Sequence, residues 1–280
     1  MHRSAASAQA RLGLRALTYR HVAPGGMPDD LVTAAHELGS LAGHQAACMT
    51  RDRNVDDYVV SSTILSALLA DGSPAHQAFA SAMARCAGRR LDWLTHAYEC
   101  AGWGYVMRRA LQKATHTGPR TLLLQIVDVD IHDFTYWHKN TQWGNSGFGV
   151  CSLLIDIAPG QEWPLSLGAA TPAMAMVQMG RALRDFSDAR PGVPVAVPFF
   201  RETSRKLLLK RIPQATVHAD GYANFGHAFG SDPWISLLLQ ASRGVSFEKT
   251  IVNSLALYGY FAIAEVELFH DTVFRLERAS

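Results

Sequence analysis

Two kinds of apolar pattern alternate along this chain: short continuous apolar runs, and stripes of apolar residues at helical spacing. The runs at residues 121–127 and 147–156 are nearly unbroken, which is typical of strands buried on both faces of a sheet. Further strands are expected at residues 56–62 and 91–95, and a closing hairpin is expected to join 250–257 to 261–268.

The helical stripes lie between these strands, and polar residues mark where several of them begin. The predicted starts are Asp29 or Asp30, the sequence Asp71-Gly-Ser-Pro74, and Ser231 or Asp232 followed by Pro233. This strand–helix–strand rhythm predicts an α/β protein with a central sheet. Residues 1–13 are expected to be frayed. The predicted helices cover residues 30–42, 75–87, the segment from Cys100 to about 114, 174–188, 200–209 and 233–240, with a connector at 159–172.

Length, composition and charge narrow the class of protein. The 280 residues are enough for one large domain or two packed halves, and 48% hydrophobic with 18% charged residues argues against disorder. The net charge is +2 without a long basic run, so no nucleic-acid partner is expected. Residues 1–16 lack a signal-peptide core, and no stretch approaches a membrane span, so we expect a cytoplasmic protein without a membrane partner.

The cysteines and arginines add two weaker indications. The four cysteines show no metal-ligand spacing, so a reducing compartment is expected. Five arginines cluster in sequence around one of the cysteines. We interpret these arginines as residues on solvated helix faces. The alternative is that they bind an acidic carrier protein or a nucleotide phosphate. The residues are Cys48, Cys86, Cys100 and Cys151, with Arg85, Arg89, Arg90, Arg108 and Arg109.

Cys100 lies where a short strand gives way to a helix, and Gly102 and Gly104 allow neighbouring segments to approach it closely. A thiol in the first turn of a helix faces the positive end of the helix dipole and unpaired N–H groups. Both favour the thiolate, and the N–H groups could bind a developing oxyanion. Because most cysteines are simply small buried apolar residues, the segment alone leaves a nucleophile and a core residue both open.

An acidic segment after the first buried run suggests a second kind of chemistry. Strand alternation places Asp128, Asp130 and His132 on one face, as metal ligands would be in a metal-dependent hydrolase. A strand end followed by a loop explains the same residues, because no motif supplies a second group of ligands. A nearby aromatic set could line a dimer interface or an acyl tunnel, or pack in the core: Phe134, Tyr136, Trp137 and Trp143.

Four stretches, in this order, carry a family resemblance. Residues 100–105 read Cys-Ala-Gly-Trp-Gly-Tyr, residues 143–150 read Trp-Gly-Asn-Ser-Gly-Phe-Gly-Val, and residues 224–232 read Asn-Phe-Gly-His-Ala-Phe-Gly-Ser-Asp. A glycine-bearing turn follows at residues 258–264. They resemble, respectively, the Cys-Ala-Gly nucleophile motif, the Phe-Gly-Asp-Gly-Ala-Gly-Ala turn, the Gly-Asn-Thr-Ser motif and the final glycine turn of the thiolase superfamily. Within that superfamily the chain is most similar to the ketoacyl-acyl-carrier-protein synthase III-like enzymes.

The resemblance implies an αβαβα layered fold made of two pseudo-equivalent halves. Residues 1–158 would form the half that carries the nucleophile, and residues 159–280 the half that carries the general base. It further implies acyl transfer or condensation from an acyl-CoA or acyl-carrier-protein thioester. A dimer is expected, either of identical chains or with a second ketosynthase-like subunit, and no cofactor or metal is expected.

Carried over residue by residue, the resemblance makes Cys100 the nucleophile and assigns the oxyanion hole to the backbone N–H groups of Cys100 and Gly259. His227 falls where the family usually has a catalytic asparagine, and an imidazole there could serve as the base. Such a thiol and base suffice for taking an acyl group from a thioester.

Departures from the family pattern leave a second function open. The region that corresponds to the family's His-Gln-Ala-Asn motif, residues 198–205, contains no histidine, and Asn145 replaces an aspartate. The first strand of the N-terminal half is predicted to be short or absent. These departures favour transfer to an amine, a hydroxyl or an unusual carbon nucleophile in secondary metabolism. They also suit a non-catalytic partner subunit, similar to a chain-length factor, although such subunits commonly lose the nucleophile that this chain retains.

Overall fold

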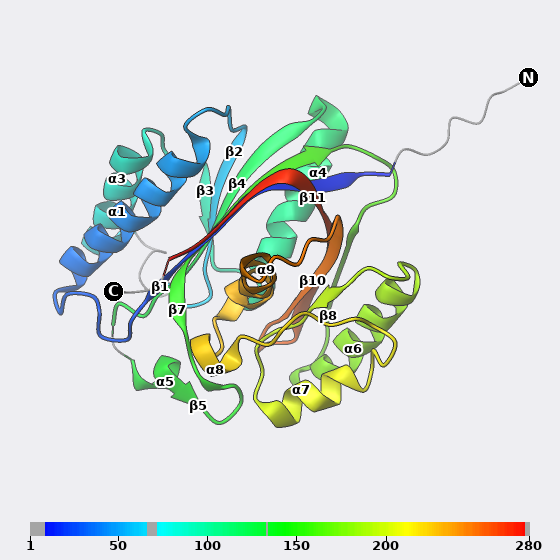
Figure 1. Cartoon of the computed structure of the whole chain (residues 1–280). Coiled ribbons are helices and arrows are strands. Elements are labelled where there is room, and N and C mark those ends of the chain that lie inside the picture. The colour runs from blue at the N-terminus through cyan, green and yellow to red at the C-terminus, as the bar shows by residue number, and fades with distance from the viewer. Residues whose placement is uncertain (1–8, 66–71, 133, 278–280) are drawn as a thin grey trace, which may run out of the picture.

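A computed structural model describes residues 9–65, 72–132 and 134–277, and one mixed sheet organises this part of the chain (Figure 1). Its strands run in the order β3-β2-β4-β7-β1-β11-β10-β9, and β8 pairs beside β11. A separate two-stranded sheet joins β5 and β6. The bounds are β1 Arg11–Val22, β2 Asp57–Ser61, β3 Trp93–Thr95, β4 Arg120–Asp128, β5 Lys139–Asn140, β6 Gly144–Asn145, β7 Phe148–Ala158, β8 Leu165–Ala169, β9 Val195–Ala196, β10 Lys249–Leu255 and β11 Tyr260–Glu277.

The helices begin close to where the polar residues predict. Asp30 caps α1 by accepting a hydrogen bond from the Thr33 N–H, and Ser73 caps α3 in the same way through the His76 N–H. The expected role of Asp71 lies outside the described residues. The helices are α1 Leu31–Thr50, α3 Pro74–Ala87, α4 Gly102–Thr117, α5 Thr135–His138, α6 Pro172–Asp188, α7 Glu202–Leu209, α8 Tyr222–Phe225 and α9 Asp232–Ser242, with short turns η1 Glu99–Ala101 and η2 Phe229–Ser231.

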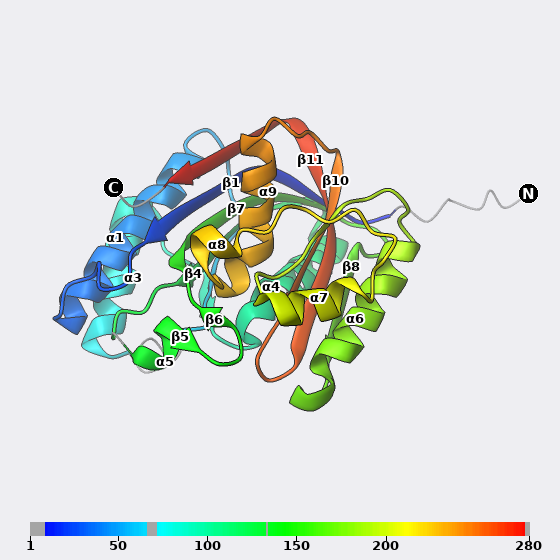
Figure 2. The same cartoon turned by 60° about the horizontal axis from the view of Figure 1, so that its bottom comes forward.

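The longer helices form three layers that alternate with two layers of strands, as Figure 2 shows from a second side. On one outer face, α1 and α3 pack against β2, β4 and β7 through a buried apolar cluster. In the middle lie α4 and α9, where Trp103 and Trp234 meet edge to face with ring centroids 5.3 Å apart. On the other outer face, α6 and α7 cover β9, β10 and β11. The predicted αβαβα layering is therefore confirmed.

The two halves repeat the same strand arrangement. In the first half β3, β2 and β4 are parallel, and then β4 pairs antiparallel with β7 and β7 with β1. In the second half a bridge at Val217, β9 and β10 are parallel, and then β10 pairs antiparallel with β11 and β11 with β8. The pseudo-equivalence of the halves is thus present, and the expected boundary at residue 158 falls between β7 and β8.

The prediction that the first strand of the N-terminal half is short or absent is wrong. β1 is 12 residues long, pairs antiparallel with β7 and pairs parallel with the far end of β11. Arginines interrupt its apolar run, which hides the strand in the sequence. The neighbouring strands neutralise these charges through three ion pairs: Arg11 with Glu267 at 4.0 Å, Arg15 with Asp156 at 2.7 Å and Arg20 with Glu277 at 3.7 Å.

The predicted connector at residues 159–172 contains a strand that the sequence did not indicate. β8 pairs with the first part of β11, and its side chains are only partly buried, so it shows no continuous apolar run. The closing hairpin is confirmed, although β11 continues to Glu277 and there joins the two halves by pairing with β1. Residues 1–8 of the segment expected to be frayed lie outside the described residues. For its last residues the expectation is wrong, because Ala10 is buried and β1 begins at Arg11.

Two further observations concern membrane-spanning helices and the state of the cysteines. Among the described helices, none is both long and apolar enough to cross a membrane. Cys48, Cys86, Cys100 and Cys151 are all free thiols. Cys48 is exposed and Cys86 is half-buried, whereas Cys100 and Cys151 are buried. The two buried thiols differ in place, because Cys151 lies within β7 and Cys100 lies at a helix start.

Candidate active site

A cavity of about 200 Å³ brings Cys100 and His227 together. Cys100 comes from η1, directly before α4, and His227 comes from the segment that precedes η2 and α9. The cavity therefore lies where the start of the central helix of one half meets the start of the central helix of the other. Other residues that line the cavity include Thr63, Glu99, Trp137, Trp143, Phe200 and Phe229.

Glycines in the first turn of α4 fix the position of Cys100. A Cβ atom on Gly102 would collide with the Ser61 hydroxyl at the end of β2, and one on Gly104 would collide with Ala262 of β11. Close approach to strands of both halves thus requires glycine at both positions, as the sequence predicts. The cysteine is consequently held between the ends of the two sheet layers.

Backbone strain is concentrated beside the cavity. In the described part of the chain, the non-glycine residues with positive φ are Tyr98 at 69°, Glu99 at 44° and Phe229 at 51°. Such conformations cost on the order of 1–3 kcal/mol each and persist only where packing enforces them. The Tyr98 ring stacks on Tyr105 at 3.6 Å and meets Tyr260 edge to face at 5.2 Å. These contacts hold the strained turn that delivers Cys100.

A buried carboxylate orients the imidazole of His227. The Nδ1 atom of His227 lies 2.6 Å from Oδ2 of Asp232. The same carboxylate accepts hydrogen bonds from the N–H groups of Phe199 at 2.9 Å and Ala228 at 2.6 Å. Backbone N–H groups can only donate, so Asp232 acts as the acceptor and Nδ1 carries the proton. Nε2 is then the nitrogen that can take a proton in the cavity.

The sequence marks Asp232 only as a helix cap, and its pairing with His227 was not predicted. The five-residue spacing across a helix start is the one signal that could have suggested it. Asp232 occupies the first position of α9 and is fully buried. Burial raises the pKa of its carboxyl, and the neighbouring His227 opposes that rise.

A second buried carboxylate, Asp128 at the end of β4, ties the two halves together beneath the cavity. Its Oδ1 accepts from the Thr63 N–H at 2.6 Å and the Ser62 hydroxyl at 3.3 Å, and its Oδ2 accepts from the Gly230 N–H at 3.3 Å. Burial raises the pKa of Asp128 to about 6. Asp128 is therefore a structural acceptor for the loop after β2 and for η2.

Burial and nearby charges act against the Cys100 thiolate that the helix start is expected to favour. Burial, followed by the negative charges of Asp128 and Glu99, raises the pKa of the Cys100 thiol well above its ordinary value. The Thr63 hydroxyl lies 3.8 Å from Sγ and lowers the pKa of the thiol, but its effect is smaller. The resting side chain is therefore a thiol that needs a base before it can attack.

The N–H of Gly259, which is expected to form part of the oxyanion hole, has a backbone acceptor in this structure. Its N–H donates to the carbonyl of Ala256 at 3.0 Å, which closes the turn between β10 and β11. The N–H groups of Tyr258, at 3.2 Å, and of Leu257 donate to the carboxylate of Glu99. The N–H groups of this turn thus already have acceptors. Cys100 keeps its expected place at the helix start.

The possible metal ligands separate from one another in the fold. Asp128 binds backbone N–H groups, Asp130 pairs with His138 at 3.3 Å, and the His132 ring stacks on Phe134 at 4.8 Å. Within the described ranges, no group of three or more His, Cys, Asp and Glu side chains is placed to hold a metal ion. The contacts of Asp128 and Asp130 are thus those of polar residues at a strand end and in the loop that follows it.

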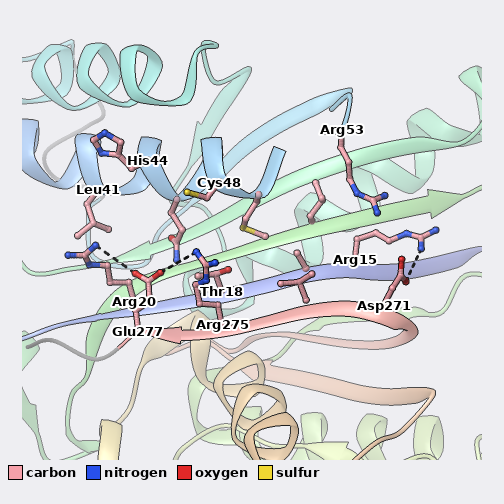
Figure 3. Close-up of a pocket in the computed structure, with 15 residues that line it drawn as sticks. Arg15, Thr18, Arg20, Leu41, His44, Cys48, Arg53, Asp271, Arg275 and Glu277 are labelled. Atoms are coloured by element: carbon pink, nitrogen blue, oxygen red, sulfur yellow. Dashed lines mark ion pairs between the residues drawn. The ribbon is translucent and has the colours of Figure 1, made fainter. Parts of the chain in front are cut away.

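A second hollow, of about 230 Å³, lies between α1 and the paired strands β1 and β11 (Figure 3). Arginines point into it, and most face a carboxylate: Arg15 lies 3.5 Å from Asp271, and Arg20 and Arg275 lie 3.7 and 3.9 Å from Glu277. These ion pairs neutralise much of the positive charge. Because neither the cysteine nor the imidazole of the first cavity lines this hollow, it is separate from the candidate active site.

The arginine cluster around the Cys100 segment does not form one patch. Arg108 lies over the ring of Tyr105 at 5.2 Å, and Arg109 lies over Trp93 at 5.1 Å. Arg89 donates to the carbonyl of Val55 at 2.7 Å. The arginines therefore support packing at several places on the first half. These contacts argue against a shared anion site, and they show that several of the arginines pack on the protein in addition to facing solvent as expected.

No family model matches the chain, and no curated protein matches it in sequence. Solved structures do match over nearly the whole chain. The crystal structure of 3-oxoacyl-(acyl carrier protein) synthase III from Pseudomonas aeruginosa has a TM-score of 0.64 and 12% identity, and the match covers 92% of this chain and 98% of that one.

Two further matches extend the comparison to other enzymes. The priming β-ketosynthase of the R1128 polyketide pathway has a TM-score of 0.61 and 12% identity, with 95% of this chain and 99% of that chain covered. ChlB3, described as an acyltransferase, has a TM-score of 0.62 and 13% identity, with 85% and 84% covered. Identities this low establish the architecture alone. The chain therefore has the thiolase-like fold of the 3-oxoacyl-(acyl carrier protein) synthase III structures.

Proposed function

We propose that the chain is an acyltransferase or condensing enzyme of the ketosynthase III type, which carries an acyl group on Cys100. The main support is that a helix-start cysteine and a carboxylate-held imidazole line one cavity. The fold shared with condensing enzymes supports the same reaction class. The donor is an acyl-CoA or an acyl-carrier-protein thioester, and the setting is a cytoplasmic pathway of secondary metabolism.

In the first half-reaction Nε2 of His227 removes the proton from the Cys100 thiol. The sulfur then attacks the carbonyl carbon of the donor thioester, and the N–H at the helix start donates to the oxyanion that forms. The donor's carbon–sulfur bond breaks, and the donor thiol leaves with the proton from the imidazolium. The raised pKa of Cys100 makes this base necessary, because few resting molecules hold a thiolate.

The second half-reaction is transfer of the acyl group rather than decarboxylative condensation. The segment that corresponds to the family's His-Gln-Ala-Asn motif contributes Phe200 and Ser204 to the cavity. The Phe200 ring lies 6.1 Å from the His227 ring. This segment thus brings an apolar ring and one hydroxyl to the cavity, but no imidazole. The missing imidazole disfavours decarboxylation of a malonyl group and favours acyl transfer.

The test is intact-protein mass after incubation with a panel of acyl-CoA and acyl-carrier thioesters. Wild type should gain the mass of one acyl group, and Cys100→Ala should gain none. Cys48→Ala is the matched control, because it removes an exposed thiol that could be acylated without catalysis. Labelling that persists in Cys100→Ala, or that disappears in Cys48→Ala, contradicts the proposal.

A non-catalytic partner subunit is the second candidate. The observation that favours it is the crowding of carboxylates around the thiol, together with the use of the β10–β11 turn N–H groups by Glu99 and Ala256. On this alternative the purified chain forms no adduct with any donor and assembles with a second ketosynthase-like chain. The enzyme proposal expects a homodimer. Sedimentation of the chain alone and with its partner separates the two.

A further inference from the structure

The Cys100 cavity has few charged side chains on its walls, and the one with a fixed charge is acidic. Among the described residues that line it, Glu99 is the one carboxylate, and there is no lysine or arginine. Asp128 and Asp232 lie buried directly behind, and both act electrostatically on the Cys100 thiol. Glu99 is therefore the acidic group that a substrate in the cavity can contact, and the two buried carboxylates add to the negative potential there.

Aromatic rings form the other walls of the cavity. Trp137 and Trp143 stack with centroids 6.3 Å apart, and each meets the Phe229 ring edge to face, at 5.9 and 6.0 Å. Phe200 continues this wall beside His227. Aromatic faces next to a carboxylate attract organic cations, because the ring face carries partial negative charge.

Glu99 is held at the cavity by local geometry. Its backbone adopts a φ of 44°, and its carboxylate accepts from the N–H groups of Tyr258, at 3.2 Å, and of Leu257. The residue is half-buried and directly precedes Cys100. A carboxylate oxygen has room for more than one donor, so Glu99 can hold the turn and still bind an N–H group of a substrate.

We propose that the acyl acceptor is a primary amine that enters as its ammonium and carries an aromatic or apolar body. Glu99 binds the ammonium, and the rings of Trp137, Trp143 and Phe229 contact the body. This inference rests on the proposed acyl-Cys100 intermediate and names the substrate class of its second half-reaction. The product is an amide of the acyl group.

The proton balance follows from the groups at the site. The ammonium gives one proton to the Glu99 carboxylate, and the resulting amine nitrogen attacks the acyl carbon of the thioester. The tetrahedral intermediate gives a second proton to Nε2 of His227. Its carbon–sulfur bond then breaks, the Cys100 sulfur takes the proton from the imidazolium, and Glu99 releases its proton to solvent. No oxidant, reductant or further reactant is required.

The experiment loads Cys100 with an acyl group, removes free donor and adds one of three isosteric acceptors: phenethylamine, phenethyl alcohol or phenethyl mercaptan. Loss of the adduct and formation of the amide, ester or thioester are followed by mass spectrometry. Phenethylamine should discharge wild type about tenfold or more faster than the other two, the effect of one charge-assisted hydrogen bond. Glu99→Gln should lose this preference, and the extent of loading is measured for each variant so that discharge is compared per molecule of adduct.

The controls separate this inference from the proposed function. Glu37→Gln, on the exposed face of α1, should discharge like wild type. An adduct that forms but is discharged equally by the three acceptors, or equally by wild type and Glu99→Gln, overturns the amine inference and leaves the acyl-Cys100 intermediate standing. If no adduct forms with any donor, calorimetric titration of the unloaded protein tests whether the cavity binds an ammonium. Phenethylammonium should bind wild type more tightly than phenethyl alcohol, and equal binding overturns the inference.

Discussion

At Cys100 the local position and the tertiary environment act in opposite directions on the thiol. A helix start stabilises a nearby negative charge by about 0.3–1 kcal/mol when exposed. Each unit of pKa shift corresponds to about 1.4 kcal/mol, and burial beside Asp128 and Glu99 raises the pKa well above the ordinary value. The larger effect comes from burial, so the sequence located the residue correctly and misjudged its protonation.

The pair of His227 and Asp232 carries a prediction at this scale. Asp232→Asn should slow acyl loading about 10²–10⁴-fold, the usual contribution of a general base. The asparagine amide would direct an N–H toward Nδ1 and move the imidazole proton to Nε2, where it blocks proton transfer. The rate of adduct formation measures this, with circular dichroism as the check on folding.

Asp220→Asn provides the matched control, since Asp220 pairs with Arg205 at 3.4 Å and does not line the cavity. It should load at the wild-type rate. Equal loading by Asp232→Asn and wild type would show that the imidazole does not act through its Nδ1 partner.

At the scale of elements, helix starts were easier to foresee than strands. Asp30, Ser73 and Pro233 marked starts within a residue or two, because capping is a local interaction between a side chain and nearby N–H groups. β1 was missed because its arginines are neutralised by residues more than a hundred positions away. No local pattern contains that information.

The α4 helix gives a prediction about packing. Gly104→Ala should lower the free energy of unfolding by about 1–3 kcal/mol, as overpacking in a core does. The added Cβ would meet Ala262 and Leu167, which belong to β11 and β8. Urea denaturation measures the change.

Gln112→Ala on the exposed face of the same helix should change the free energy of unfolding by no more than about 0.5 kcal/mol. Equal values for the two variants would mean that the β8–β11 pair moves away from α4 at little cost. The close approach that holds Cys100 between the halves would then not depend on glycine.

At the scale of the whole molecule, β11 and Asp128 join the two halves. β11 pairs with β10 and β8 in the second half and with β1 in the first. Asp128 accepts hydrogen bonds from the loop after β2 and from η2. Folding of the two halves is therefore expected to be coupled, and a change at Asp128 should affect the stability of the entire chain.

Asp128 also makes the stability depend on pH. Its pKa in the folded protein is about 6, above the ordinary value of 3.8, so the folded state holds the proton more tightly than the unfolded state. The contribution to stability is greatest below the ordinary value and is lost as pH rises toward 6. The loss is about 3 kcal/mol across this window.

Asp128→Asn removes this titration. It should lower stability at every pH, because the NH₂ group of the asparagine side chain would face a backbone N–H and could not accept its hydrogen bond. Denaturation of both proteins at pH 4 and pH 7 checks the sign. The advantage of wild type over the variant should shrink by about 2.4 kcal/mol between pH 4 and pH 7. A constant difference would mean that Asp128 titrates alike in the folded and unfolded states.

The sequence by itself determined the α/β class, most helix starts, the buried strands and the layered fold implied by the motifs. It also determined that Cys100 begins a helix and that His227 precedes another. These features depend on local periodicity, on capping and on the order of short motifs. Each of them can be recognised within a few consecutive residues.

The tertiary structure decided which side chains meet. It placed Cys100 and His227 in one cavity, gave His227 its partner Asp232, and assigned Glu99 to the turn that was expected to supply an oxyanion donor. It also raised the pKa of the thiol through carboxylates from distant segments. Contacts and burial between residues far apart in sequence leave no periodic pattern, and electrostatics in a buried site depends on those contacts alone.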